Sequence, residues 1–281
     1  MVALTTCVMI AFAGNSLLCR LALKSTAIDP ATFTLARLAS GAVVLWLITS
    51  LRMREGSPRH GGNWPSAIAL FVYAATLSFS YSAMTAATGA LLLFGAVQIT
   101  MIGRAMVGGE NMGPWQWLGV VLAFVGLTIL LLPGLATPPA AASALMICSG
   151  IAWGVYSIRG KGAVNPTLVT AGNFLRTVPF ALVLSALTWS QFSADAAGLT
   201  FALASGAITS GLGYAIWYAV LPALKGTSAA TIQLSVPAIA ALGATMFLGE
   251  SISARFVVAT AATIGGIALT VLCKPTGRPA G

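Results

Sequence analysis

The sequence predicts an all-α integral membrane protein with ten transmembrane helices, arranged as two inverted five-helix repeats. Three observations predict this class. The 281 residues are 58% apolar and only 7% charged, whereas soluble domains carry about 25% charged residues. The chain divides into ten apolar runs, each near the roughly 20 residues that a transmembrane helix needs. A Gly-Glu pair followed by an apolar run occurs at Gly109 and again at Gly249, about half a chain later.

The first apolar run extends from Met1 to Leu23. It has no basic region at its start and no cleavage pattern before a soluble domain, so we expect a retained span rather than a signal peptide.

Polar or helix-breaking segments separate the ten runs. The expected breaks are Lys24–Pro30, Arg52–Asn63, Ala83–Thr88, Gly108–Pro114, Pro133–Ala140, Arg159–Pro166, Ser190–Ala197, Pro222–Gly226 and Glu250–Ala254. Pro30 and Pro166 each open the second helix of their half, since proline suits the first helical turn. The third break contains no charge and depends on Gly89, but leaving it out makes one run too long for a single crossing.

The distribution of basic residues predicts the orientation. With both termini in the cytoplasm, nine Lys and Arg residues fall on the cytoplasmic side: Arg52, Arg54, Arg59, Arg104, Arg159, Lys161, Lys225, Lys274 and Arg278. The other side has three: Arg20, Lys24 and Arg255. This bias satisfies the positive-inside rule and accounts for the net charge of +9. We expect no nucleic-acid partner, because the basic residues are not clustered on a folded domain.

The duplication extends beyond the Gly-Glu pairs. Arg20 and Arg37 are separated by the same 17 positions as Arg159 and Arg176. The second pair therefore repeats the first with a shift of 139 residues, which agrees with the spacing of the Gly-Glu pairs.

These shifts divide the chain into repeats at residues 1–135 and 136–281, and a shift of 140 also places Gly126 on Gly266. Each repeat holds five spans, an odd number, so the second repeat enters the membrane upside down. Inverted repeats occur in many secondary transporters, whose substrate site lies near the midplane between the halves. The alternative is a duplicated membrane scaffold that transports nothing.

Several segments resemble the EamA branch of the drug/metabolite transporter superfamily. "AGNSLLCRLAL" is similar to the family's first helix, "TLARLASGAVVL" to its second, and "IQLSVPAIAALGATMFLGE" to its ninth, with Pro237 in place. The chain departs by having Val97 in place of the first-half proline and Ala13 in place of a tryptophan. Among family members, the chain resembles the YddG-type exporters of aromatic and other amino acids.

The resemblance implies a transporter in the bacterial inner (plasma) membrane that exports small amphiphilic metabolites by alternating access, with amino acids as the expected class. A multidrug or toxic-metabolite exporter is the runner-up, and a passive channel is a third possibility. The expected partners are a small-molecule substrate and the lipid bilayer, and the chain is expected to be a monomer or a homodimer. The family places the cavity between the first, third, fourth, sixth, eighth and ninth helices.

Few residues are suited to chemistry, so we expect no enzyme and no metal or other cofactor. The acids, Asp29, Glu55, Glu110, Asp195 and Glu250, fall in loops or at span ends, and the single histidine, His60, lies in a basic loop. Neither a nucleophile–base pair nor a set of metal ligands can be assembled from these residues. Because the Gly-Glu turn is repeated, we expect its glutamate to help start the helix that follows.

Polar and aromatic residues within the spans are the substrate-site candidates. Amides inside apolar spans need hydrogen-bond partners, and aromatic rings with a few amides suit an amphiphilic organic solute. The predicted substrate-binding residues are Asn15, Tyr81, Gln98, Trp153, Tyr156, Tyr214, Trp217, Tyr218 and Gln233. Hydrogen bonding between helices and aromatic core packing are the alternatives.

Arg37 and Arg176 lie inside spans, where an unpaired charge is costly. Each would bind a substrate carboxylate, cap a neighbouring helix end, or extend its charged group to the membrane interface. We favour the structural role, because both lie seven to ten residues from the start of their helix.

Small residues four apart indicate close helix packing on the fifth and tenth spans. Gly119 with Ala123, and Ala261 with Gly265, form such faces, which let two backbones approach closely. We expect them to serve helix packing or a dimer contact.

Overall fold

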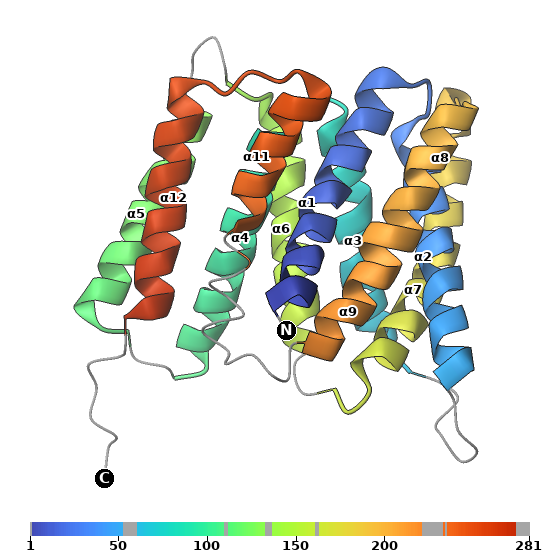
Figure 1. Ribbon diagram of the computed structural model, residues 1–281, viewed down its shortest axis with the longest axis horizontal. Helices are drawn as coiled ribbons and strands as arrows, with labels where there is room; N and C mark the ends of the chain where they lie inside the picture. The colour runs from blue at the N-terminus through green and yellow to red at the C-terminus, as the bar shows by residue number, and fades with distance from the viewer. Residues whose placement is uncertain are drawn as a thin grey trace.

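The computed structural model describes residues 2–52, 61–109, 112–132, 137–160, 163–220, 233 and 235–273, and across them it is all helical, with no strand. The helices lie side by side in one bundle, with the connecting turns gathered at its two ends (Figure 1). This arrangement confirms the all-α class. The predicted break at Pro222–Gly226 lies outside the described residues.

Helices α1 to α5 make up the first half of the chain. Their bounds are Val2–Ser25, Pro30–Arg52, Trp64–Tyr81, Ala86–Val107 and Pro114–Leu131. The second half contains α6 (Ala140–Gly160), α7 (Pro166–Leu187), the short 3₁₀ turn η1 (Trp189–Gln191), α8 (Ala196–Ala204), the π-helical segment η2 (Ser205–Leu212), α9 (Gly213–Val220), α11 (Ser235–Leu248) and α12 (Ala254–Leu272). Segments α8, η2 and α9 follow one another without a break.

Local sequence signals set the helix ends. Side chains of Asn63, Thr85 and Ser253 accept hydrogen bonds from backbone N–H groups in the first turns of α3, α4 and α12, which satisfies donors that have no partner within the helix. The capping by Thr85 confirms the predicted break between the third and fourth spans. Gly109 and Gly249 follow α4 and α11 with φ of 88° and 61°, a conformation that favours glycine. This backbone conformation explains why glycine precedes glutamate in both Gly-Glu pairs.

Eight helical segments are long and apolar enough to cross a membrane: α1, α2, α4, α5, α6, α7, the continuous segment from α8 into α9, and α12. Helix α11 is apolar but shorter. These segments are those of a multi-pass membrane protein.

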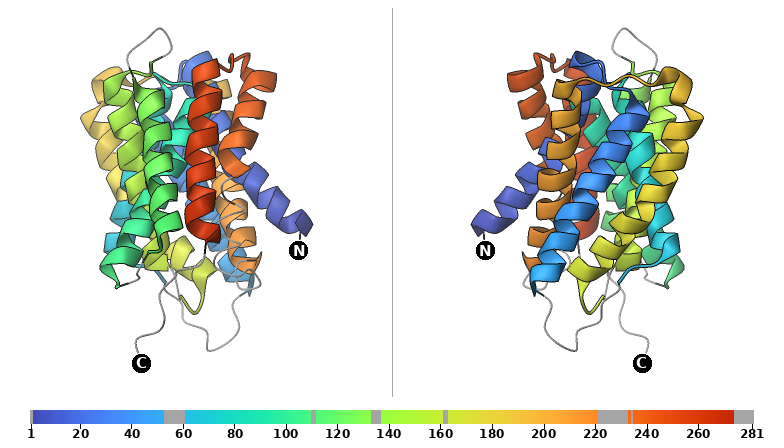
Figure 2. Two further views of the ribbon diagram at one scale, coloured as in Figure 1. Left: turned by 90° about the vertical axis from the view of Figure 1, so that its left-hand side faces the viewer. Right: turned by 90° about the vertical axis from the view of Figure 1, so that its right-hand side faces the viewer.

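The bundle has a central group of helices flanked by two side groups. Helices α5 and α12 pair at one side, and α2, α7 and α8 group at the other, with α1, α3, α4, α6, α9 and α11 between them (Figure 1). The N-terminal end of α1 leans away from the bundle in both views of Figure 2. The turns at residues 26–29, 82–85 and 249–253 lie at the upper end in Figure 1, which we call the Glu250 face. The other end is called the opposite face.

Helices α5 and α12 pack with their backbones in close contact. A Cβ atom placed on Gly119 would collide with the carbonyl oxygen of Gly266, and one on Gly126 would collide with Thr263. Glycine is needed at these positions because any side chain would push the two helices apart.

The predicted face on α5 is buried against α12, but the predicted face on α12 does not meet α5, so only a dimer contact stays a prediction for it. Ala261 and Gly265 are exposed, and nothing lies within 4 Å of a Cβ atom placed on Gly265. The buried face carries Ala259, Thr263 and Gly266 instead. Small residues occur on both faces of α12, so their spacing alone does not indicate which face meets α5.

Two neighbouring glycines provide a test of this interface. We expect Gly266→Val to destabilise the protein by about 1–3 kcal/mol, the range for overpacked cores, because its side chain would collide with the backbone of α5. The matched control, Gly265→Val, adds the same side chain to an exposed position. Thermal unfolding of the two purified variants in detergent measures the difference, and equal melting temperatures would contradict the described packing.

Candidate functional site

A small cavity lies at the centre of the bundle, between α1, α3, α4, α6 and the segment running from η2 into α9. Its lining residues are Phe12, Asn15, Ser16, Tyr73, Leu93, Phe94, Trp153, Thr209, Ser210 and Tyr214. Its volume is about 20 Å³, which is room for about one water molecule. An organic solute therefore fits only after the surrounding helices or side chains move.

A chain of hydrogen bonds forms the polar wall of this cavity. The hydroxyl oxygen of Tyr73 accepts from Asn15 Nδ2 at 3.2 Å and from Arg37 Nη2 at 3.0 Å. Asn15 Oδ1 in turn accepts from the hydroxyls of Ser205 at 2.9 Å and Thr209 at 3.3 Å. Side chains of α1, α2, α3 and η2 are thus hydrogen-bonded to one another inside an apolar bundle, where an unmade hydrogen bond is costly.

Aromatic rings form the second wall. The Trp153 ring stacks on Tyr214 with centroids 5.1 Å apart and lies 4.8 Å from the Tyr73 ring. Phe12 packs edge-on against Tyr214 and Trp217, each at 5.9 Å. Such a cluster offers a large apolar surface with preferred ring geometry, and the Tyr73 ring connects it to the hydrogen-bonded residues of the lining.

The π-helical segment η2 brings α8 and α2 together beside the cavity. Gly206 lies so close to α2 that a Cβ atom there would collide with the carbonyl oxygen of Arg37. The Ser40 hydroxyl donates to the carbonyl oxygens of Arg37 at 3.1 Å and Leu203 at 3.3 Å. Short π-helical segments are frequent at functional sites, and this one carries Thr209 into the cavity wall.

Three of the predicted substrate residues, Asn15, Trp153 and Tyr214, line the cavity together. Two others lie directly behind the lining. Tyr156 packs 5.6 Å from Trp153, and its hydroxyl donates to Thr170 Oγ1 at 3.4 Å. Trp217 contacts the lining residue Phe12, as described above.

The remaining predicted residues are not brought to the cavity. Gln98 is buried in α4, and Gln233 is half-buried, but neither lines it. Tyr81 is fully buried at the end of α3, near the Glu250 face. The side chain of Tyr218 lies outside what the structure describes.

Sequence reasoning missed several lining residues, among them Phe12, Ser16, Tyr73, Thr209 and Ser210. Serine and threonine are common in membrane spans because their hydroxyls often bond to a carbonyl of their own helix, as Thr209 does with Ser205. Tyr73 had a detectable signal, since it is a tyrosine in the middle of an apolar run.

The two intramembrane arginines have different surroundings. Arg176 Nη1 donates to the carbonyl oxygens of Gly61 at 2.7 Å and Gly172 at 2.8 Å, so it links α7 to the segment before α3. Arg37 is 1% exposed, donates to the Tyr73 hydroxyl and lies 5.2 Å from the centre of the Tyr73 ring.

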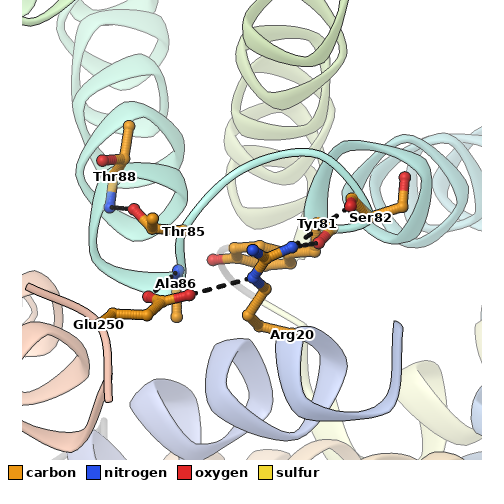
Figure 3. Close-up of polar contacts among 7 residues, drawn as sticks. All are labelled: Arg20, Tyr81, Ser82, Thr85, Ala86, Thr88 and Glu250. Atoms are coloured by element: carbon orange, nitrogen blue, oxygen red, sulfur yellow. Dashed lines mark hydrogen bonds and ion pairs between the residues drawn. The ribbon is translucent and has the colours of Figure 1, made fainter. Parts of the chain in front are cut away.

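A network at the Glu250 face joins three parts of the chain (Figure 3). Arg20 Nε forms an ion pair with Glu250 Oε1 at 3.0 Å, and Arg20 Nη1 donates to the carbonyl oxygens of Tyr81 at 2.8 Å and Ser82 at 3.3 Å. The second oxygen of Glu250 accepts from the N–H of Ala86 at 2.8 Å. We call these five residues the latch.

Glu250 stabilises a helix start, but of a different helix from the one expected. Its carboxylate accepts the N–H of Ala86, at the start of α4, while Ser253 caps α12. A carboxylate at a helix N-terminus is favoured by the helix dipole. The latch therefore connects α1, the turn between α3 and α4, and the turn between α11 and α12.

The latch lies at the Glu250 face and separates the cavity from that end of the bundle. On α1, Arg20 follows the lining residue Ser16 by one helical turn, toward the end of the helix at that face. The ion pair joins α1, in the first half of the chain, to the turn between α11 and α12, in the second half. These two parts cannot separate at the Glu250 face while the ion pair is intact.

We expect Glu250→Gln to open the Glu250 face, because the variant loses the ion pair with Arg20. The reporter is Ser16→Cys in a chain whose Cys7, Cys19, Cys148 and Cys273 are replaced by alanine. A membrane-impermeant maleimide applied to the Glu250 face should label this cysteine about tenfold faster in the variant, which corresponds to roughly 1.4 kcal/mol.

The matched control is Asp195→Asn, which removes the carboxylate that caps α8 and leaves the latch intact. It should leave the labelling rate unchanged. Equal rates in Glu250→Gln and the parent would show that the latch does not hold this face closed.

Comparisons with known proteins agree with this geometry. Residues 141–272 match the EamA-like transporter family. An uncharacterized protein of Pseudomonas aeruginosa, PA1977, is 51% identical over 277 residues, which cover 99% of this chain and 96% of that protein. A solved crystal structure of a protein superposes with a TM-score of 0.66 over 95% of this chain and 98% of its own, at 20% identity, and so shares the fold. The chain belongs to the EamA-like transporter family of the drug/metabolite transporter superfamily, whose members are membrane transporters and not enzymes.

Proposed function

We propose that the protein is a bacterial inner-membrane exporter of small amphiphilic metabolites, namely amino acids including aromatic ones, as in the YddG-type members of the family. The observation that carries this proposal is the central cavity, where an aromatic wall faces hydrogen-bonding side chains. Small-molecule sites commonly combine apolar walls with a few convergent polar groups. An amino acid has an apolar side chain for the rings and polar groups for the opposite wall.

The proposed exporter has ten spans in two inverted halves. Adding α3, with 18 residues, and α11 to the eight long apolar segments makes ten. If the halves are inverted repeats, the equivalent helices are α1 and α6, α2 and α7, α3 and the α8–α9 segment, α4 and α11, and α5 and α12. The packing supports this: α3 packs on α6 as the α8–α9 segment packs on α1, and α4 packs on α6 as α11 packs on α1.

The interface between α5 and α12 supports the same repeat. Gly119 packs on Gly266. In a repeat of 140 residues, Gly119 corresponds to Ala259 and Gly266 to Gly126, so these two residues should also be in contact. The Ala259 carbonyl does lie against Gly126. The match to the EamA-like family, residues 141–272, also falls within the proposed second repeat, residues 136–281.

Alternating access would use the latch and its release. In the described conformation, the latch ties the Glu250 face together, and the cavity is too small for an organic solute. Arg20 lies at this face, whereas Arg104 and Arg159 lie near the other ends of their helices. In the proposed orientation, the opposite face and both termini are cytoplasmic, in keeping with the positive-inside rule.

Counterflow in proteoliposomes tests this proposal. Vesicles preloaded with unlabelled phenylalanine should accumulate labelled phenylalanine transiently, and a competition screen of all amino acids would define the range of substrates. Movement of dyes or quaternary cations without amino-acid exchange would replace this proposal with the multidrug exporter. Flux that neither saturates nor responds to trans substrate would indicate a channel.

We expect Trp153→Ala to lower the rate of phenylalanine exchange about twofold to tenfold, the range of one lost aromatic contact. The matched control is Trp46→Ala, which removes a tryptophan that is 59% exposed on α2. Initial uptake rates, normalised to the amount of inserted protein, give the comparison. Equal rates in both variants would assign Trp153 to core packing.

A further inference from the structure

Arg37 is a buried positive charge in the membrane-spanning part of the bundle. It is 1% exposed and lies in the eighth position of the 23-residue helix α2. An arginine in this environment is expensive unless it pairs with an anion or meets water. The fold fixes its position, because its carbonyl oxygen is held by Ser40 and packed against Gly206.

Two of its three guanidinium nitrogens have no hydrogen-bond partner among the described residues. Nη2 donates to the Tyr73 hydroxyl, but Nε and Nη1 are buried without an acceptor in the described part of the chain. Nearly all buried polar groups in proteins are hydrogen-bonded, so a buried exception calls for an explanation.

The described carboxylates are all engaged elsewhere. Asp29 accepts from the N–H groups of Ala31 and Thr32, Asp195 caps α8, and Glu250 is part of the latch. Glu55 and Glu110 lie outside the described residues. Within the described chain, the charge of Arg37 is therefore not balanced by an ion pair.

Arg37 lies directly behind the cavity wall. The Tyr73 hydroxyl to which it donates also accepts from Asn15, and both partners line the cavity. Because the Tyr73 oxygen accepts both of these bonds, its own proton remains to be donated. The guanidinium and this hydroxyl are both donors, which together suit an anion.

We propose that Arg37 binds the carboxylate of the transported solute and thereby selects solutes with one carboxylate. This inference rests on the proposed function and specifies how its substrate is recognised. The guanidinium fork matches a carboxylate with two parallel hydrogen bonds. One carboxylate balances one arginine, whereas a dianion leaves a surplus negative charge and a quaternary cation is repelled in this weakly polar surrounding.

The bound solute then spans both walls. Its carboxylate takes the place next to Tyr73, and its apolar side chain lies against Trp153 and Tyr214. Binding requires the cavity to widen, since it is now about 20 Å³. In this arrangement Arg37 sets the class of solute, while the aromatic wall sets the preferred side chain.

The test compares two competitors of labelled phenylalanine counterflow that share a phenyl ring. 3-Phenylpropionate has the carboxylate without the amine, and phenethylamine has the amine without the carboxylate. In the wild-type protein, 3-phenylpropionate should compete at least about tenfold better. In Arg37→Gln this preference should fall to about one, and in Arg37→Lys, which keeps the charge but loses the fork, it should be intermediate.

The matched control is Arg176→Gln, which alters the other intramembrane arginine and should keep the wild-type preference. Equal competition by the two compounds in the wild type, or an unchanged preference in Arg37→Gln or Arg37→Lys, would overturn the role of Arg37 while phenylalanine exchange continued. If Arg37→Gln does not insert into the membrane, the preference for 3-phenylpropionate over phenethylamine is compared between the wild type and Arg37→Lys alone. Absence of phenylalanine exchange in the wild type would instead overturn the proposed function itself.

Discussion

The hydroxyl oxygen of Tyr73 is the point at which the polar interior of the bundle is connected. Hydrocarbon offers no hydrogen-bond partner, so polar groups at this depth must satisfy one another. Through this oxygen, Asn15 on α1 and Arg37 on α2 both bind α3, and Asn15 extends the chain of bonds to η2. The cavity lies beside this junction because α1, α3 and η2 each supply residues of its lining.

The bundle combines two kinds of helix contact with different physical character. Between α5 and α12, glycines bring the two backbones into close contact, and such packing changes only if the whole interface separates. The latch is made of charged groups near the end of the bundle, where water can hydrate both Arg20 and Glu250 once they part. A peripheral pair of helices with fixed packing and a reversible ionic contact over the cavity suit a protein whose central helices move.

Much of the fold could be predicted from the sequence, because membrane spans depend on local composition. The turn between α3 and α4 was expected and is present, but it ends at Thr85, and Gly89, the glycine on which the expectation depended, lies in the first turn of α4. Asn15, Trp153 and Tyr214 were expected because polar and aromatic residues in the middle of apolar runs are unusual. The ion pair between Arg20 and Glu250 was not predicted, since its partners are 230 positions apart and nothing local connects them.

The two repeat-related arginines show most clearly what sequence spacing leaves undetermined. Arg37 and Arg176 lie seven and ten residues after the prolines that open α2 and α7, and the same structural role was predicted for both. In the structure, Arg176 bonds to two backbone carbonyls, whereas Arg37 faces a tyrosine beside the cavity. Their surroundings differ because Arg37 meets the middle of α3 whereas Arg176 meets the segment before it, and this depends on tertiary packing that one sequence does not encode locally.

Arg37 also bears on the order in which the chain is built into the membrane. Placing an arginine at the centre of a span during insertion costs about 2.5–3.5 kcal/mol, while each Leu, Ile, Phe or Val recovers about 0.3–0.6 kcal/mol. Helix α2 contains nine such residues, which together offset the cost. On this balance α2 needs no partner for its charge during insertion, and the Tyr73 hydroxyl becomes available to it only once α3 has followed.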